Sequence, residues 1–209
     1  MGFRRSFRFA ALFVLCVVAN ALQAEPMRYP FDRNHSTIGF AASVMKVSKV
    51  TGKFPDFEGK VILQDPKDLT TATVEVKIQA ASIDTGVPDR DEHLRSEDFF
   101  DTTKFPEITF VSKAVRKVGA EYLIDGTFTM HGVAKELTIP FKLVQQSDVL
   151  AAEAHLTINR MDYGVAWTRQ MDDGSQFVDA EVRIDLYLLT RVGVLASTPE
   201  KPKTPGKKD

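Results

Sequence analysis

The four histidines have the widest chemical capacity in this chain, because an imidazole can bind a metal ion or transfer a proton near neutral pH. They are His35, His93, His131 and His155, and no pair has HExxH spacing. A tetrahedral metal site needs three or four converging ligands, and the single cysteine, Cys16, rules out a cysteine-built site. Hydrogen bonding at strand edges is the expected role, so no metal site and no cofactor are predicted. Metal binding by some of the histidines stays open as an alternative.

A dense run of mixed charge from Asp89 to Asp98 could supply carboxylates for acid–base chemistry. Asp91 and Glu92 are adjacent, however, and neighbours in sequence do not face each other on a helix. A solvated helix with internal salt bridges is therefore expected. Arg90 and Arg95 have the fork geometry that suits phosphate, so contact with a pyrophosphate group on a ligand stays open for them.

Nucleophilic catalysis has no support in the sequence. There is no Gly-x-Ser-x-Gly elbow and no glycine-rich phosphate loop. Ser82, Ser96 and Ser112 have no evident base beside them. Twenty-seven basic residues against 28 acidic ones give a formal charge of -1, which is not the charge pattern of a nucleic-acid partner. The chain is predicted not to be an enzyme and not to bind nucleic acid.

The sequence predicts that strands position any functional site in this chain. In residues 73–79, Val74, Val76 and Ile78 alternate with Glu75 and Lys77, which is the period of a strand with one apolar and one wet face. The same alternation occurs in five further runs: Leu137/Ile139/Phe141/Leu143, Val182/Ile184/Leu186/Leu188, Ile38/Phe40/Ala42, Ile108/Phe110 and Tyr122/Ile124/Phe128. One-sided apolar strands are typical of antiparallel sheets.

Turn residues separate these runs, and about eight strands are expected. The predicted turns lie at Gly52, Phe57–Gly59, Asp65–Pro66, Gly119, Gly132 and Asp172–Gly174. One interior helix is expected to begin at Pro88, which suits a first helical position, with Leu94, Phe99 and Phe100 turning inward. Eight meandering strands bury one face either in a closed barrel or in a sandwich. The fold class predicted is all-β with one inserted α-helix.

The two ends of the chain have the composition of segments outside the folded domain. Residues 1–24 carry three arginines, then an apolar run from Phe9 to Val18, then small residues. This pattern predicts a signal peptide cleaved after Ala21 or Ala24 and export from the cytoplasm. Residues 197–209 are rich in proline and lysine and predict a disordered tail. Transient contact of this tail with an anionic membrane surface stays open.

Several segments resemble the YceI-like family of secreted, lipocalin-like proteins. The most specific is the run from Thr85 to Asp101, which continues through Lys104–Phe110. Gly126–Ile139 and Asn159–Val165 follow in the family's order. The opening segments Asp32–Ser36 and Val50–Phe54 fit as well. The polar loop between Trp167 and Phe177 departs from the family pattern, which leaves the identity of a ligand head group open.

The resemblance implies an extended eight-stranded antiparallel barrel over residues 25–196, with a hydrophobic tunnel. It also implies a periplasmic protein that holds or carries an isoprenoid lipid, either an isoprenoid quinone or a polyprenyl chain. Inward-facing strand residues are the expected ligand contacts, because an isoprenoid offers little besides apolar area. These are Ile38, Phe40, Val74, Val76, Ile78, Phe110, Phe128, Leu137, Ile139, Phe141, Val182 and Ile184.

Two alternatives from other functional classes remain: a metal-dependent enzyme that uses the histidines at the barrel rim, and a stress or interaction module with a closed core. The first requires that the histidines converge, and the second requires a filled interior. The sequence leaves open which isoprenoid is bound, whether it is transported or stored, and whether the protein forms a homodimer.

Overall fold

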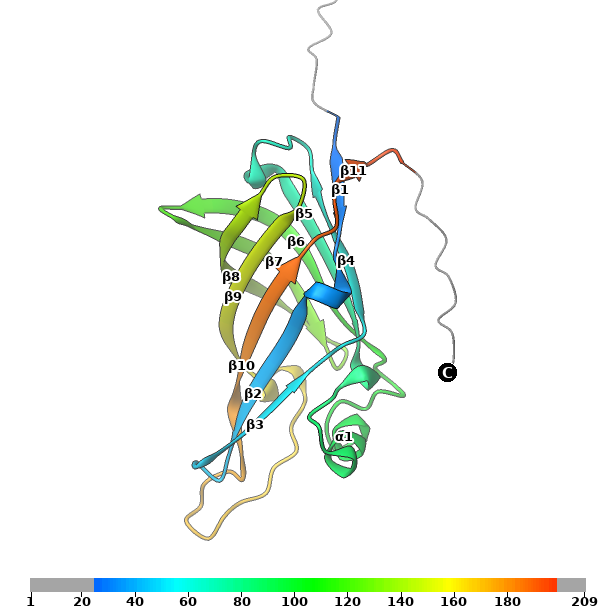
Figure 1. Ribbon diagram of the computed structural model, residues 1–209. Coiled ribbons are helices and arrows are strands. Elements are labelled where there is room, and N and C mark those ends of the chain that lie inside the picture. Colours follow the sequence, from blue (N-terminus) through cyan, green and yellow to red (C-terminus); the bar gives the residue numbers. More distant parts are fainter. Residues whose placement is uncertain (1–24, 199–209) are drawn as a thin grey trace, which may run out of the picture.

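The computed structural model describes residues 25–198, in which eleven strands form one antiparallel sheet (Figure 1). Residues 1–24, predicted as a signal peptide, and residues 199–209 of the predicted tail lie outside the described part. The strands are β1 (Met27–Pro30), β2 (Thr37–Val44), β3 (Ser48–Lys53), β4 (Phe57–Leu63), β5 (Ala72–Gln79), β6 (Glu107–Val118), β7 (Glu121–Met130), β8 (Val133–Gln146), β9 (Leu150–Asn159), β10 (Val178–Leu189) and β11 (Val194–Leu195). The helices are α1 (Pro88–Arg95) and four short 3₁₀ helices, η1 (Arg33–His35), η2 (Leu69–Thr71), η3 (Ala80–Ser82) and η4 (Arg160–Tyr163).

The sheet closes on itself through two interrupted strands. β2 pairs with β3 and β1 pairs with β4, so β1/β2 and β3/β4 are two interrupted strands lying side by side. β4 continues to β5, the order then runs stepwise to β10, and β10 returns to β2. If β1/β2 and β3/β4 each count as one strand, the ring has the predicted eight strands. The short strand β11 pairs with β1 at the edge of the sheet.

The predicted fold class, an all-β lipocalin-like barrel with one α-helix, is confirmed. The strand count differs from eight because the two interruptions divide long strands and because β11 is too short to show a periodic pattern.

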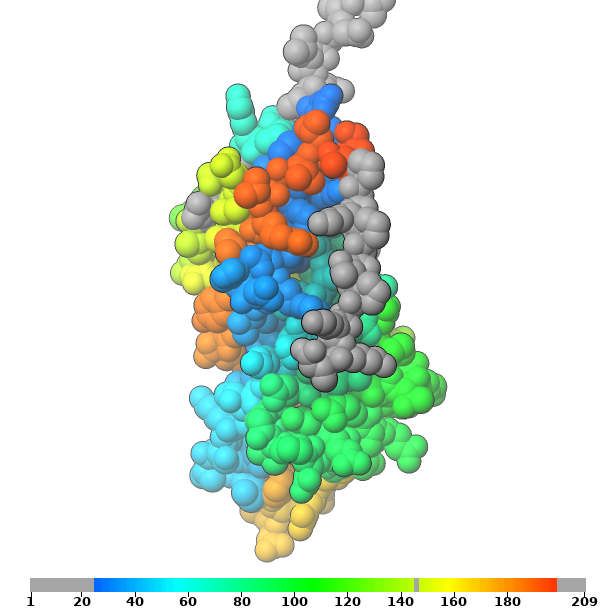
Figure 2. All heavy atoms as spheres, turned by 45° about the vertical axis from the view of Figure 1, so that its right-hand side comes forward, coloured from blue at the N-terminus to red at the C-terminus, as the bar shows by residue number. Residues whose placement is uncertain are grey.

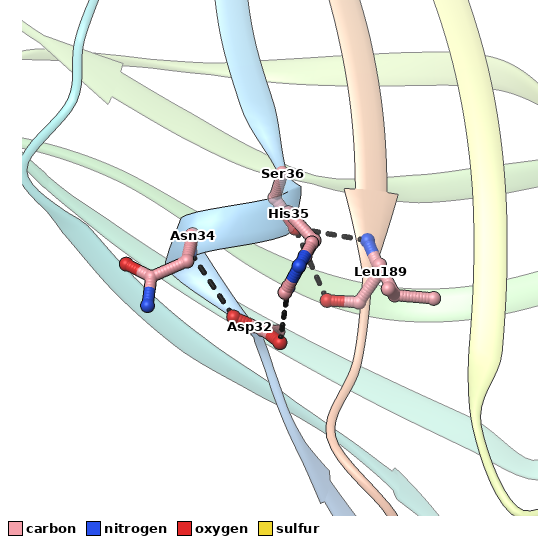
Figure 3. A network of polar contacts seen from close by, with 5 residues as sticks. All are labelled: Asp32, Asn34, His35, Ser36 and Leu189. Carbon is pink, nitrogen blue, oxygen red and sulfur yellow. Dashed lines mark hydrogen bonds and ion pairs between the residues drawn. The ribbon is translucent and has the colours of Figure 1, made fainter.

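A polar network holds the break between β1 and β2 against the end of β10 (Figure 3). The Asp32 carboxylate accepts from the backbone N–H of Asn34 at 3.1 Å, and its other oxygen lies 2.8 Å from His35 Nδ1. The Ser36 hydroxyl donates to the Leu189 carbonyl at 3.1 Å and accepts from the Leu189 N–H at 2.9 Å. These bonds replace the ladder bonds that the break removes, so the ring stays closed where β1 turns into β2.

The alternation predicted for the strands sorts the side chains between the two faces of the barrel. On β5, Val74, Val76 and Ile78 face the interior, whereas Glu75 forms an ion pair with Lys60 of β4 at 3.2 Å. Outward charged pairs of this kind are solvated and contribute little to stability. The free energy of folding therefore comes mainly from the apolar inner faces.

Two of the predicted turns are wrong: Gly52 lies within β3 and Gly59 lies within β4. Both glycines make room for an aromatic ring. A Cβ at Gly59 would lie 2.7 Å from the ring of Phe31 and against the backbone carbonyl of Glu75, and a Cβ at Gly52 would overlap the ring of Phe40. In these two strands, glycine therefore marks a place where an aromatic ring lies close to the backbone, whereas the sequence alone suggests a turn.

The predicted start of the helix is confirmed by α1, with Pro88 in its first turn, but the helix ends at Arg95, so Phe99 and Phe100 lie in the segment that follows it. The helix lies at one end of the barrel, at the bottom of Figure 1, together with the β2–β3 hairpin and the loop between β9 and β10. The chain ends of the described part, near β1 and β11, lie at the opposite end. No helix within residues 25–198 is long and apolar enough to cross a membrane.

Substitution of Gly59 by alanine is expected to lower the free energy of unfolding by about 1–3 kcal/mol, because backbone as well as a ring blocks the added methyl group. The matched control is Gly39→Ala in β2, where an added Cβ makes only ordinary contacts at 3.5 Å or more. Urea denaturation of both variants measures the difference. Equal stability of the two variants would contradict the close packing at Gly59.

Candidate ligand-binding cavity

The barrel encloses a cavity of about 260 Å³ whose lining is almost entirely apolar. All twelve residues predicted to contact a ligand lie on its wall. They come from the inward-facing positions of six strands, β2, β5, β6, β7, β8 and β10. The residues are Ile38, Phe40, Val74, Val76, Ile78, Phe110, Phe128, Leu137, Ile139, Phe141, Val182 and Ile184. Their position on the wall is therefore established, and their contact with a ligand stays a prediction.

The six strands named above supply the predicted residues, and β9 supplies a further part of the wall that the sequence analysis missed. Its inward positions include Ala152, Ala154, Leu156 and Ile158. Alanine contrasts only weakly in hydropathy with its neighbours, so the alternation in β9 is hard to detect from the sequence. The small side chains have a structural consequence as well, because they fill less of the interior than the leucines and phenylalanines opposite them.

Aromatic rings close the cavity at the end where α1 lies. The Phe54 ring contacts Phe40 at 5.7 Å and Phe100 at 5.8 Å between centroids. Phe99 stacks on Trp167, with centroids 5.2 Å apart. Trp167 belongs to the β9–β10 loop, so this loop and the segment after α1 cover the same end of the barrel. Figure 2 shows α1 and its following segment in green, beside the cyan β2–β3 hairpin and above the yellow loop.

Charged hydrogen bonds hold α1 in place. The predicted solvated helix agrees with the exposed residues Asp89, Glu92 and His93, but the prediction missed the burial of Asp91. Asp91 is buried, and its carboxylate accepts from the Thr85 N–H at 2.9 Å and from the Thr85 hydroxyl at 2.6 Å. The hydrogen bonds from Thr85 hold the pKa of Asp91 below its ordinary value of 3.8, against the opposing effect of burial. The Asp91 carboxylate thus anchors the helix to the chain that precedes it.

Arg90 and Arg95 also make contacts that the sequence did not reveal. Arg90 donates to the hydroxyl and the carbonyl of Thr85, at 2.7 and 3.1 Å. Arg95 donates to the carbonyl of Ala81 at 2.9 Å and to that of Ile83 at 3.4 Å. Both guanidinium groups therefore fix α1 to neighbouring backbone, and their contact with a pyrophosphate group stays a hypothesis.

The four histidines lie in different parts of the fold, in η1, α1, the β7–β8 turn and β9, and three of them pair with an aspartate. The pairs are His35–Asp32 at 2.8 Å, His93–Asp98 at 2.9 Å and His155–Asp185 at 2.6 Å, while His131 packs on the ring of Phe105 at 4.4 Å between centroids. Within residues 25–198, no group of three or more histidine, cysteine, aspartate or glutamate side chains is arranged to hold a metal ion.

Comparison with known proteins matches residues 29–189 to the model of the YceI-like domain. A UPF0312 protein of Shewanella sp. strain ANA-3 is 41% identical over 176 residues, which cover 80% of this chain and 88% of that protein.

Two solved structures have a similar fold. BcnA of Burkholderia cenocepacia has a TM-score of 0.68 at 26% identity, covering 76% of this chain and 98% of that one. A domain of Saccharophagus degradans described as polyisoprenoid-binding has a TM-score of 0.60 at 18% identity, covering 78% of this chain and 98% of that one. At 18% identity, the second likeness concerns the fold alone.

Substitution of Asp91 by alanine is expected to lower the free energy of unfolding at neutral pH by about 1–3 kcal/mol, because two hydrogen bonds to a buried carboxylate are lost. Since the pKa of Asp91 is lower in the folded state than in the unfolded state, its carboxylate stabilises the fold above the ordinary pKa of 3.8. This contribution is lost as the pH falls through the folded-state pKa. The difference between Asp91→Ala and the native protein should therefore shrink in acid.

The matched control is Glu92→Ala, which changes an exposed carboxylate on the same helix and should alter stability by no more than about 0.5 kcal/mol. Urea denaturation at neutral and acidic pH gives both free energies. A loss for Asp91→Ala that is no greater than the loss for Glu92→Ala would contradict the anchoring role of Asp91.

Proposed function

The chain belongs to the YceI-like family, and on that premise we propose that its barrel binds an isoprenoid lipid in the internal cavity. The observation that carries this proposal is the apolar cavity, lined from several strands and closed by aromatic rings at one end. An isoprenoid has almost no hydrogen-bonding groups along its chain, so burial of apolar area must supply its affinity. The polyisoprenoid-binding description of the Saccharophagus degradans domain supports the same ligand class.

The cavity is large enough to take up a ligand. A single water needs about 10–15 Å³ of such space, so a volume of about 260 Å³ is far larger than a packing defect and has room for part of a hydrocarbon chain. A chain that buries several hundred Å² gains on the order of 10 kcal/mol, at about 25 cal/mol for each Å², before the cost of association. Burial alone can therefore retain such a ligand.

The predicted export signal in residues 1–24 supports a location in the periplasm. We propose that the protein holds or carries its lipid there, with an isoprenoid quinone or a polyprenyl chain as the ligand. No catalytic step is part of this proposal. Contact with a membrane surface and formation of a homodimer remain hypotheses for experiment.

The two alternatives fit the described residues less well. A metal-dependent enzyme requires converging ligands, and the four histidines lie in separate parts of the fold. A closed-core interaction module requires a filled interior, and the barrel contains a cavity.

The proposal is tested by native mass spectrometry of the full chain exported to a bacterial periplasm, followed by solvent extraction. We expect an added mass that releases an isoprenoid on extraction. Protein without added mass, which also stays free of ligand after incubation with ubiquinone and with polyprenyl lipids, would contradict the proposal.

Substitution of Phe128 by arginine is expected to abolish retention of the lipid, because it places a charge in the apolar cavity. Phe40→Arg should act in the same way at the other wall. The matched control is Val111→Arg on β6, whose side chain is 50% exposed on the outer face and which should keep the lipid. Extraction of each folded variant measures the bound lipid, and native levels in folded Phe128→Arg protein would contradict the assignment of the cavity.

A further inference from the structure

The tip of the β2–β3 hairpin exposes two apolar side chains to solvent. The tip consists of Met45, Lys46 and Val47, the three residues between the paired positions Val44 and Ser48. Val47 is 88% exposed, more than any other large hydrophobic residue within residues 25–198, and Met45 is 45% exposed. Apolar surface in water is unfavourable, so a polar residue would be less costly at both positions.

The backbone of this tip adds a second cost. Met45 and Lys46 have φ angles of 51° and 61°, in the left-handed region. Glycine adopts this region freely, and asparagine and aspartate are enriched there among the other residues. Methionine thus occupies a position at which a small polar residue would be more stable. A strained backbone position that carries an exposed apolar side chain indicates a use for that side chain.

The tip is fixed to the β9–β10 loop by two bonds. The Met45 N–H donates to the Phe177 carbonyl at 2.8 Å, and Lys46 Nζ lies 2.9 Å from Asp173 Oδ2. Figure 1 shows the hairpin and this loop at the end of the barrel where α1 lies. Because the tip is already held in place, its apolar side chains lose little further freedom when they meet a partner.

The hairpin leads directly to the end of the cavity. Ala42 pairs with Val182 of β10, and Val44, next to the tip, pairs with Val178. Ala42, Val178 and Val182 line the cavity. An apolar medium in contact with the tip would therefore lie close to this end of the cavity.

The chemistry of the tip fits a lipid bilayer better than a protein partner. A stable protein interface buries about 800 Å² on each side, far more than two side chains on a turn provide. Lys49 is exposed and has no ion-pair partner among the described residues, whereas Lys46 shares its charge with Asp173. A lysine keeps its ammonium group among lipid head groups while apolar neighbours enter the hydrocarbon boundary, and it favours anionic lipids.

We propose that Met45 and Val47 insert into a lipid bilayer and dock the α1 end of the barrel on the membrane. The contact uses a different part of the chain from the lysine-rich residues 197–209. Docking does not require a bound isoprenoid. Uptake of a lipid from the bilayer at the docked end is a further consequence, and that consequence rests on the proposed function.

The test is flotation of the protein, exported to a bacterial periplasm from the full chain, with vesicles of phosphatidylethanolamine and phosphatidylglycerol. The native protein should bind. The double variant Met45→Asn, Val47→Ser should bind about 10- to 100-fold more weakly, because two apolar side chains no longer enter the bilayer. Asparagine suits the left-handed backbone, so this variant should fold at least as stably as the native protein. Native binding by the folded double variant would overturn the proposal.

The matched control is Val144→Ser, which changes a valine that is 67% exposed near the β8–β9 turn. The carbonyl of Asp148 in that turn accepts from the Gly193 N–H at 2.9 Å, beside β11 and away from α1. Val144→Ser should leave vesicle binding unchanged. Equal losses in this control and in the double variant would overturn the specific role of the hairpin tip.

Lys49→Gln tests the charge at the tip. It should weaken binding to the vesicles with phosphatidylglycerol about fivefold, the effect of one lysine near an anionic surface. Binding to vesicles of phosphatidylcholine alone, which have no net charge, should not change. Equal weakening on both kinds of vesicle would contradict an electrostatic contribution of Lys49 to docking.

A second measurement follows the tip itself. The dye-labelled variant Val47→Cys, with an environment-sensitive fluorophore, should emit at shorter wavelength when vesicles are added, whereas Val144→Cys with the same dye should not change. Cys16 lies in the predicted signal peptide, so the exported protein is expected to offer one thiol for labelling. A change at position 144 without one at position 47 would overturn the proposal.

The failure of docking and the failure of the proposed function give different results. Native protein that carries an isoprenoid but does not float with either kind of vesicle would overturn docking alone. Native protein that floats with vesicles but never holds an isoprenoid would contradict the proposed function and leave docking supported.

Discussion

Closure of the sheet into a ring is the constraint on which the rest of this structure depends. A closed ring leaves few unpaired edges, but it also encloses every inward-facing side chain. Residues such as Val76, Ile139 and Ile184 can then be buried only against each other or against a guest molecule. Since the inward positions of β9 include alanines, the enclosed side chains do not fill the interior. The cavity is thus a consequence of side-chain size on a closed sheet.

Closure also explains why polar groups gather where the strands are interrupted. The break between β1 and β2 removes ladder hydrogen bonds, and the Asp32, His35 and Ser36 side chains supply replacements there. A helix as short as α1 is not stable by itself. The Asp91 carboxylate and the Arg95 guanidinium hold it over the end of the barrel. Charged hydrogen bonds therefore position the elements that the apolar interior cannot hold.

A cavity lined only by hydrocarbon would bind many lipids of similar size. Apolar area gives affinity without direction, whereas one polar group at a fixed place gives orientation and selectivity. The described lining of this cavity is almost entirely apolar, and the buried Arg160 guanidinium beside it donates to the backbone carbonyls of Val165, Val178 and Asp179.

The sequence by itself determined the parts of this protein that depend on local periodicity. Alternation placed Val74, Phe110 and Leu137 on the inner face, and Pro88 marked the start of the helix, because these signals lie within a few residues of one another. The sequence could not show that Gly59 lies inside a strand, since the reason is the ring of Phe31 packed against it. Nor could it show that the interior stays partly empty or that the Arg160 guanidinium binds backbone carbonyls at both ends of the β9–β10 loop. Those features depend on side chains far apart in the sequence, which only the closed sheet brings together.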